Sequence, residues 1–103
     1  MTCPSDDLIV RLDPDLEEII PFFLELRRQN IAEIVAAVNG EDFERVRWLG
    51  HNIKGAGGSY GFTRVSAIGL ALERAARSAD ATAIRRLAEE LAAYLDRVEI
   101  RFD

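Results

Sequence analysis

Apolar residues recur every three or four positions from Ile20 to Phe102, and this spacing, rather than strict alternation of apolar and polar residues, dominates the chain. The first spacing is typical of amphipathic helices, whereas strict alternation is typical of half-buried strands. The pattern therefore predicts an all-α fold. Because four long helices are joined by short turns, it favours an antiparallel up-down-up-down four-helix bundle with a short additional N-terminal helix.

Prolines and a glycine mark the ends of the first two helices. Asp13 and Pro14 are of the residue types preferred at the N-cap and first position of the short N-terminal helix. Pro21 either interrupts this helix or opens the next one, and Asn39-Gly40 supplies a left-handed stop. The inward positions between these signals are Phe23, Leu24, Ile31, Ile34, Val35 and Val38.

Two aspartates mark the starts of later helices. Asp42 is expected to cap a helix that ends near Ser59 to Gly61, and Asp80 to cap the last helix. The inward positions of the helix after Asp42 are Phe43, Val46, Leu49, Gly50, Ile53 and Gly57. Those of the next helix are Val65, Ile68, Leu72, Ala75, Ala76 and Ala79, and those of the last are Ile84, Leu87, Leu91, Leu95, Val98 and Phe102.

The length and composition fit one domain over residues 1–103, with 1–12 expected to be extended or poorly ordered. A net charge of -5 argues against nucleic acid, because binding a phosphate backbone needs clustered cations. Cys3 is the only cysteine, so neither a disulfide nor a cysteine metal site can form within the chain. No signal peptide or membrane span is recognisable, so we expect a cytoplasmic monomer that does not bind membranes.

The only histidine, His51, falls about 140° from the middle of the apolar arc of its helix, so it is expected to face water. Arg47, Lys54, Gly55 and Gly58 share its side of the helix. Lys54 is the only lysine, one turn after the histidine, and its flexible ammonium group could follow an arriving phosphoryl group. The alternative is that Lys54 is an ordinary solvated side chain.

Glycines inside this helix each cost about 0.5 to 1 kcal/mol relative to alanine, so something should offset them. Gly50 and Gly57 lie on the inward arc, where close helix packing accounts for them. Gly55 and Gly58 lie beside the histidine, where a flat clearing for a docking partner accounts for them. The alternative is that Gly57-Gly58 merely ends the helix.

The stretch 51–62, His-Asn-Ile-Lys-Gly-Ala-Gly-Gly-Ser-Tyr-Gly-Phe, followed by Leu72-Glu73, closely resembles the signature of histidine-containing phosphotransfer (HPt) domains of two-component phosphorelays. The resemblance implies that His51 accepts the phosphoryl group and that Lys54 helps to neutralise its oxygens. It also implies that Gly55 and Gly58 leave room for the incoming active site.

On the adjacent helix, Glu73 matches the position from which family members contact the imidazole, and Arg77 is expected to reach the same surface. The alternative for Glu73 and Arg77 is a plain i,i+4 contact worth a few tenths of a kcal/mol. Trp48 and Tyr60 are bulkier than the motif requires, which leaves the docking footprint open.

The resemblance implies a phosphocarrier that exchanges a phosphoryl group with the aspartate of a response-regulator receiver domain. A hybrid sensor histidine kinase is a second candidate partner. No cofactor or metal is expected on this chain, and Mg²⁺ is expected only on the receiver. The chain has no phosphate-binding loop for ATP and no second histidine for a helical metal site, so an autokinase or a metal hydrolase is not expected. The alternatives are a helical adaptor that is never phosphorylated and a dimerising bundle.

Overall fold

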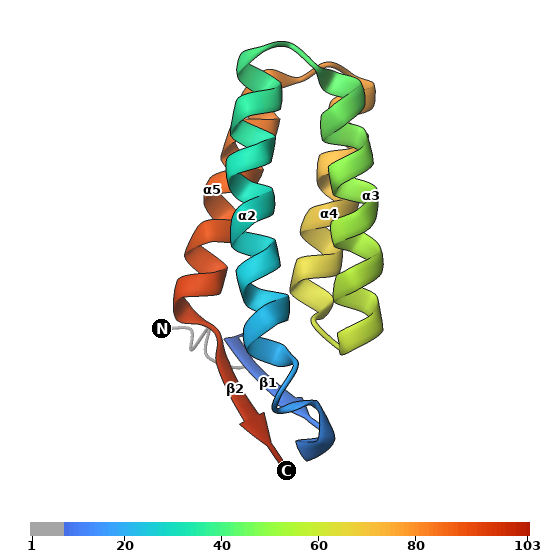
Figure 1. Cartoon of the computed structure of the whole chain (residues 1–103). Helices are drawn as coiled ribbons and strands as arrows, with labels where there is room; N and C mark the ends of the chain where they lie inside the picture. The colour runs from blue at the N-terminus through green and yellow to red at the C-terminus, as the bar shows by residue number, and fades with distance from the viewer. Residues whose placement is uncertain (1–7) are drawn as a thin grey trace, which may run out of the picture.

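The computed structural model describes residues 8–103 and is mostly helical, in agreement with the expected all-α class (Figure 1). Two four-residue strands frame the helices in the chain order β1, η1, α2, α3, α4, α5, β2. The elements are β1 Ile9–Leu12, η1 Pro14–Leu16, α2 Ile20–Asn39, α3 Phe43–Tyr60, α4 Thr63–Arg77, α5 Ala81–Arg97 and β2 Glu99–Phe102. Cys3, and the part of the expected extended segment before residue 8, lie outside the described residues.

The helix starts follow the expected caps. The Asp42 carboxylate accepts a hydrogen bond from the backbone N–H of Arg45, and Asp80 does the same for Ala83, each at 3.1 Å. In place of a short N-terminal helix, η1 is a single 3-10 turn after the N-cap Asp13. Pro21 lies in the first turn of α2 and therefore opens that helix rather than interrupting one.

The turn between α2 and α3 differs from the expected glycine stop. Gly40 has a φ of -92°, and the left-handed residue is Glu41, with a φ of 57°. Ala79 takes the same conformation, with a φ of 51°, after α4 has already ended, so it is not an inward position of that helix. In both turns the N–H of the following aspartate closes back onto a carbonyl five residues earlier, which holds the strained residue in place.

The strand pair corrects the expectation of helices throughout. β1 and β2 pair in parallel, with Ile9 opposite Glu99 and Leu12 opposite Phe102, at the end of the bundle where α2 begins and α5 ends (Figure 1). The last helix therefore stops before Val98, and Phe102 packs from a strand. This sheet joins the two ends of the described chain and closes the bottom of the core.

The core contains apolar residues from all four helices and from the turn before α4. Phe23, Ile34 and Val38 are buried as expected, but Val35 is 40% exposed, because the buried face of α2 also includes Arg27 and Ala37. The residues with no exposed surface are Ile34, Val46, Ile53, Phe62, Val65, Leu72, Ile84 and Leu91.

Glycines allow α3 and α4 to pack closely, as expected for Gly50 and Gly57. A Cβ atom at Gly57 would lie 2.6 Å from the backbone nitrogen of Ser66, and one at Gly50 would lie 2.8 Å from that of Glu73. Because positions later in α3 face positions earlier in α4, the two helices run in opposite directions. Their close approach places the middle of α4 beside the outer face of α3.

Candidate functional site

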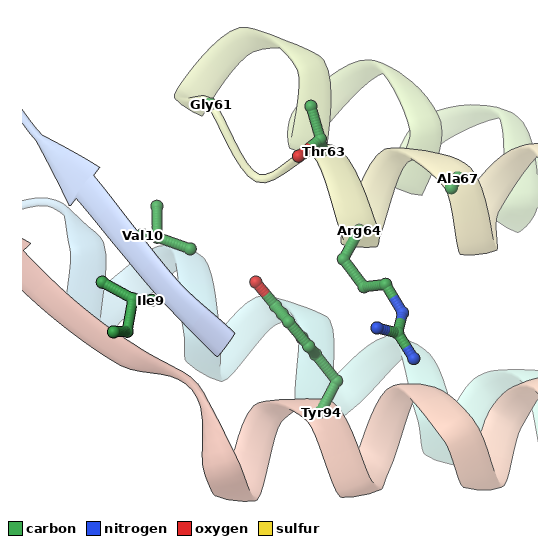
Figure 2. A pocket seen from close by; sticks show the side chains of 7 residues that line it. All are labelled: Ile9, Val10, Gly61, Thr63, Arg64, Ala67 and Tyr94. Carbon is green, nitrogen blue, oxygen red and sulfur yellow. The ribbon is translucent and has the colours of Figure 1, made fainter. Parts of the chain in front are cut away.

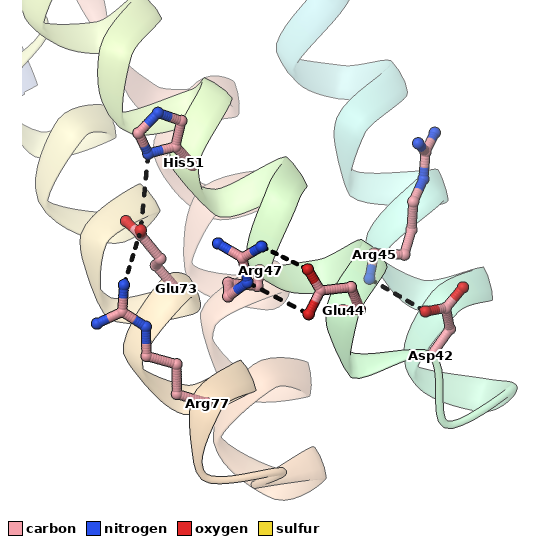
Figure 3. A network of polar contacts seen from close by, with 7 residues as sticks. All are labelled: Asp42, Glu44, Arg45, Arg47, His51, Glu73 and Arg77. Atoms are coloured by element: carbon pink, nitrogen blue, oxygen red, sulfur yellow. Dashed lines mark hydrogen bonds and ion pairs between the residues drawn. The ribbon is translucent and has the colours of Figure 1, made fainter.

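His51 lies in the middle of α3 and its side chain is 62% exposed, as the helical wheel predicts. The inward positions of α3 are taken by residues such as Leu49 and Ile53, so the imidazole is left on the water-facing side. Figure 3 shows the ring between the outer surface of α3 and α4, with Nδ1 turned toward Glu73 and Nε2 turned away from it.

Three cationic or basic groups converge on the Glu73 carboxylate. The Lys54 Nζ lies 3.0 Å from Oε1. The Arg77 guanidinium lies 3.5 Å from Oε2, and His51 Nδ1 lies 3.6 Å from the same Oε2 (Figure 3). The Glu73 side chain is only 8% exposed, and the Lys54 ammonium is the group nearest to its buried Oε1. The structure thus brings together four of the residues that the sequence singled out on these two helices, namely His51, Lys54, Glu73 and Arg77.

The Glu73 carboxylate is held in its ionised form. The contact with Lys54 is the main cause of a lowered pKa for Glu73, and the charges of His51 and Arg77 add to it, although burial acts in the opposite direction. An ionised carboxylate beside Nδ1 favours the imidazole tautomer that has its proton on Nδ1. The separation of 3.6 Å is longer than a hydrogen bond, so the effect is electrostatic.

Arg47 lies one turn before His51 but is paired with Glu44 on its own helix (Figure 3). The hydrogen bond and charge of Glu44 raise the pKa of Arg47, and Arg47 lowers the pKa of Glu44. Both side chains are on the surface, where such a pair contributes little to stability. Arg47 therefore borders the histidine without contacting it.

The surface of α3 beside His51 is free of side chains at Gly55 and Gly58. A Cβ atom at Gly55 would meet nothing within 4 Å, and one at Gly58 would come no closer than 3.9 Å to the Ser66 hydroxyl. Packing therefore does not require glycine at either position, in contrast to Gly50 and Gly57. The helix also continues past Gly57-Gly58 to Tyr60, so these glycines do not end it.

The sequence reading missed two residues of α4 that position the site. A Cβ atom at Gly69 would lie 2.7 Å from the carbonyl oxygen of Gly50, so Gly69 completes the close contact between the helices. The Ser66 hydroxyl donates a hydrogen bond of 3.0 Å to the carbonyl oxygen of Lys54. Ser66 and Gly69 are small residues three positions apart on α4, which is a weak signal that does not identify the helix they face.

An exposed apolar stripe on α2 was also missed. Phe22 is 70% exposed and Leu26 is 50% exposed, and Glu33 shares their face because of its spacing. Glu33 forms an ion pair of 3.2 Å with Arg45 on α3, so this face of α2 borders α3. The two apolar residues lie outside the inward arc of α2, which was a readable signal in the sequence.

The two bulky aromatic residues of α3 have different surroundings. Tyr60 is half-buried and its ring lies 5.3 Å from that of Phe23, so it belongs to the packing between α2 and α3. Trp48 is half exposed, one turn before His51, with the Arg45 guanidinium 4.9 Å from its ring. Trp48 therefore belongs to the exposed surface around the histidine, and Tyr60 does not.

A separate cavity of about 350 Å³ lies between β1, the start of α4 and the end of α5 (Figure 2). It is lined by Ile9, Val10, Gly61, Thr63, Arg64, Ala67 and Tyr94. None of these residues belongs to the histidine site. Within residues 8–103 no cluster of potential metal ligands occurs, and no helix is both long and apolar enough to cross a membrane.

The fold and site define a small helical protein that presents one histidine, flanked by cations, on an open helix surface. The family model described as Hpt domain matches residues 18–100, and the chain therefore belongs to the HPt family of phosphorelays. Searches of curated proteins and of solved structures give no match. Members of this family take part in histidine phosphotransfer as phosphocarriers and are not autokinases.

Proposed function

We propose that this chain is a phosphorelay intermediate in which His51 accepts a phosphoryl group from the aspartate of a response-regulator receiver domain and donates it to another. One observation carries the proposal: the only histidine is exposed on α3, with its Nδ1 toward a buried carboxylate and its Nε2 toward solvent. A transfer partner can reach Nε2 without any movement of the bundle.

The accepting atom in this proposal is Nε2. The ionised Glu73 favours the tautomer with the proton on Nδ1, which leaves a lone pair on Nε2 for attack on phosphorus. The P–O bond of the receiver's aspartyl phosphate breaks as the P–Nε2 bond forms, and the electron pair leaves on the aspartate. The Nδ1 proton stays on the ring.

Phosphoryl transfer needs mainly in-line positioning and charge stabilisation, so a carrier needs few groups of its own. Lys54 supplies a cation one turn from His51, and Arg47 adds positive charge on the other side. Gly55 and Gly58 allow the receiver's aspartate to approach in line. The Mg²⁺ needed for the chemistry would be held by the receiver.

The docking face extends beyond the residues around the histidine. Phe22 and Leu26 lie on the same face of α2 as Glu33, which contacts Arg45 near the start of α3. The start of α2 lies at the same end of the bundle as the end of α3 (Figure 1), so Phe22 and Leu26 are nearer to the half of α3 that contains Gly55. An exposed apolar patch beside open helix surface is typical of a protein interface. We therefore assign the apolar stripe to binding the receiver and the His51 surroundings to the chemistry.

The alternative function is a helical adaptor that binds a receiver through the same face and is never phosphorylated. The two are separated by incubating a phosphorylated receiver domain with the wild-type chain and with His51→Gln. A carrier removes the phosphoryl group from the receiver only when His51 is present, while both proteins still bind the receiver. If neither protein removes the phosphoryl group faster than the receiver loses it alone, and both still bind, the result would support the adaptor.

A further inference from the structure

Glu73 is a buried carboxylate whose charge is balanced by groups that phosphorylation would disturb. Its side chain is 8% exposed, with Lys54 at one oxygen and with Arg77 and His51 at the other. A buried charge is costly unless a counter-charge stays near it. In residues 8–103 these three side chains are the only positive or basic groups within 4 Å of the carboxylate.

A phosphoryl group on His51 would compete with Glu73 for Lys54. It adds about 1.5 to 2 negative charges to the ring that lies 3.6 Å from Oε2. The lysine ammonium is a compact charge on a flexible stem, and it can turn from the carboxylate to the phosphoryl oxygens. If it did so with no replacement, Glu73 would be left buried beside a second anion.

Arg77 is placed to provide that replacement. It lies one turn after Glu73 on α4, its side chain is 64% exposed, and its guanidinium is 3.5 Å from Oε2. Arginine and carboxylate groups form their strong contacts at about 2.7 to 2.9 Å, so the distance between Arg77 and Glu73 can still shorten. The guanidinium can close on the carboxylate with little loss of packing.

We propose that Glu73 exchanges its cation when His51 is phosphorylated, with Lys54 moving to the phosphoryl oxygens and Arg77 closing on the carboxylate. This inference rests on the proposed function of His51. Arg77 is then a positioning residue, which touches neither phosphorus nor Nε2 but releases Lys54 to do so. The contrasting view is that Arg77 forms an ordinary i,i+4 pair that only supports the helix.

The composition of the chain makes the exchange directly observable. Lys54 is the only lysine and His51 the only histidine, so ¹⁵N-labelled lysine gives one side-chain signal and phosphohistidine can form at one site. Phosphoramidate serves as the donor, because its P–N bond breaks with release of ammonia as the P–Nε2 bond forms. This donor makes the test independent of any particular receiver.

In the wild-type chain we expect phosphorylation to shift the Lys54 Nζ signal. In Arg77→Gln we expect a smaller shift and a ratio of phosphorylated to free histidine that is about three- to fivefold lower at equal donor concentration. Arg77→Lys should recover most of both effects. Arg74→Gln, on the same helix but not among the cations near Glu73, is the matched control and should behave as wild type.

A double-mutant cycle separates the exchange from a merely structural role. Arg77→Gln should reduce phosphorylation by a different factor in the wild-type chain and in Lys54→Ala, because only the wild-type chain has a lysine that Arg77 can release from Glu73. An unchanged Lys54 signal in phosphorylated wild-type protein would overturn the exchange, as would an equal effect of Arg77→Gln with and without Lys54. Absence of phosphohistidine in the wild-type chain with both phosphoramidate and receivers would instead overturn the proposed function.

Discussion

Gly50 and Gly69 face each other across the interface between α3 and α4, and neither has room for a side chain. A Cβ atom at Gly50 would lie 2.8 Å from the carbonyl oxygen of Gly69, and one at Gly69 would lie 2.7 Å from that of Gly50. Lys54 follows Gly50 by one turn, and Glu73 follows Gly69 by one turn. The contact between the glycines therefore sets how closely the carboxylate approaches the ammonium.

Replacing Gly69 with alanine is expected to destabilise the domain by about 1 to 3 kcal/mol, because backbone on both helices would have to move apart. Gly40→Ala is the matched control, since a Cβ atom there would make ordinary contacts of 3.7 and 3.8 Å and the φ is -92°. Urea denaturation of the two variants measures the difference. A Gly69→Ala protein as stable as Gly40→Ala would show that the close packing of these helices is not required.

At Gly55 the effects on stability and on transfer should separate. Gly55→Ala has open space around it and should raise stability by about 0.5 to 1 kcal/mol. Gly55→Gln should also fold, but its side chain would hold the receiver's aspartate away from Nε2 and slow transfer by on the order of a hundredfold. Gly40→Gln, remote from His51, controls for the larger side chain. Full transfer activity in a stable Gly55→Gln variant would contradict the role of a flat surface here.

The lowered pKa of Glu73 predicts a pH dependence of stability. A carboxylate whose folded pKa lies below its ordinary value of 4.5 stabilises the fold above that value, and the contribution is lost as the pH falls through the folded pKa. The free energy of unfolding of wild type should therefore exceed that of Glu73→Gln at pH 7, and the difference should shrink below pH 4.5. Urea titrations at both pH values measure it, and a constant difference would contradict the ionised pair.

Phe22 tests the assigned docking stripe. Because its side chain is 70% exposed, Phe22→Ser should change stability by no more than about 0.5 kcal/mol. It should weaken binding to a receiver severalfold, while Val35→Ser, another exposed apolar position of the same helix, should not. Calorimetric titration with an unphosphorylated receiver measures both. Equal affinities for the two variants would remove the stripe from the interface.

Local signals in the sequence predicted the helices and part of the site, because they depend on spacing within one element. The aspartate caps, the exposed histidine and the inward Gly50 and Gly57 all follow from residue type and helical period. Gly69 was missed because the atoms that leave no room for a side chain there belong to α3, a different helix. Its partner surface becomes visible only when α3 and α4 are placed together.

The strand pair could not be predicted in the same way. β1 and β2 are four residues each and are separated by almost the whole described chain, so no local pattern predicts that they pair. The alternation of apolar and polar residues from Val98 to Asp103 was a signal for β2 itself, and it was missed. Val98 and Phe102 also continue the helical spacing of α5, which made the last helix seem longer than it is. The sequence predicted the left-handed residue at Gly40, because glycine adopts this conformation most easily. In the structure the left-handed residue is Glu41, directly before the helix cap Asp42.

The most direct test of the account is to locate the phosphoryl group after incubation with a phosphorylated receiver domain. We predict that the chain gains one phosphoryl group, that the modification is acid-labile and alkali-stable as a phosphorus–nitrogen bond is, and that peptide mapping places it on His51. The His51→Gln variant should gain none. A phosphoryl group found on serine, threonine or aspartate of this chain, or retained in full by the His51→Gln variant, would contradict the central claim.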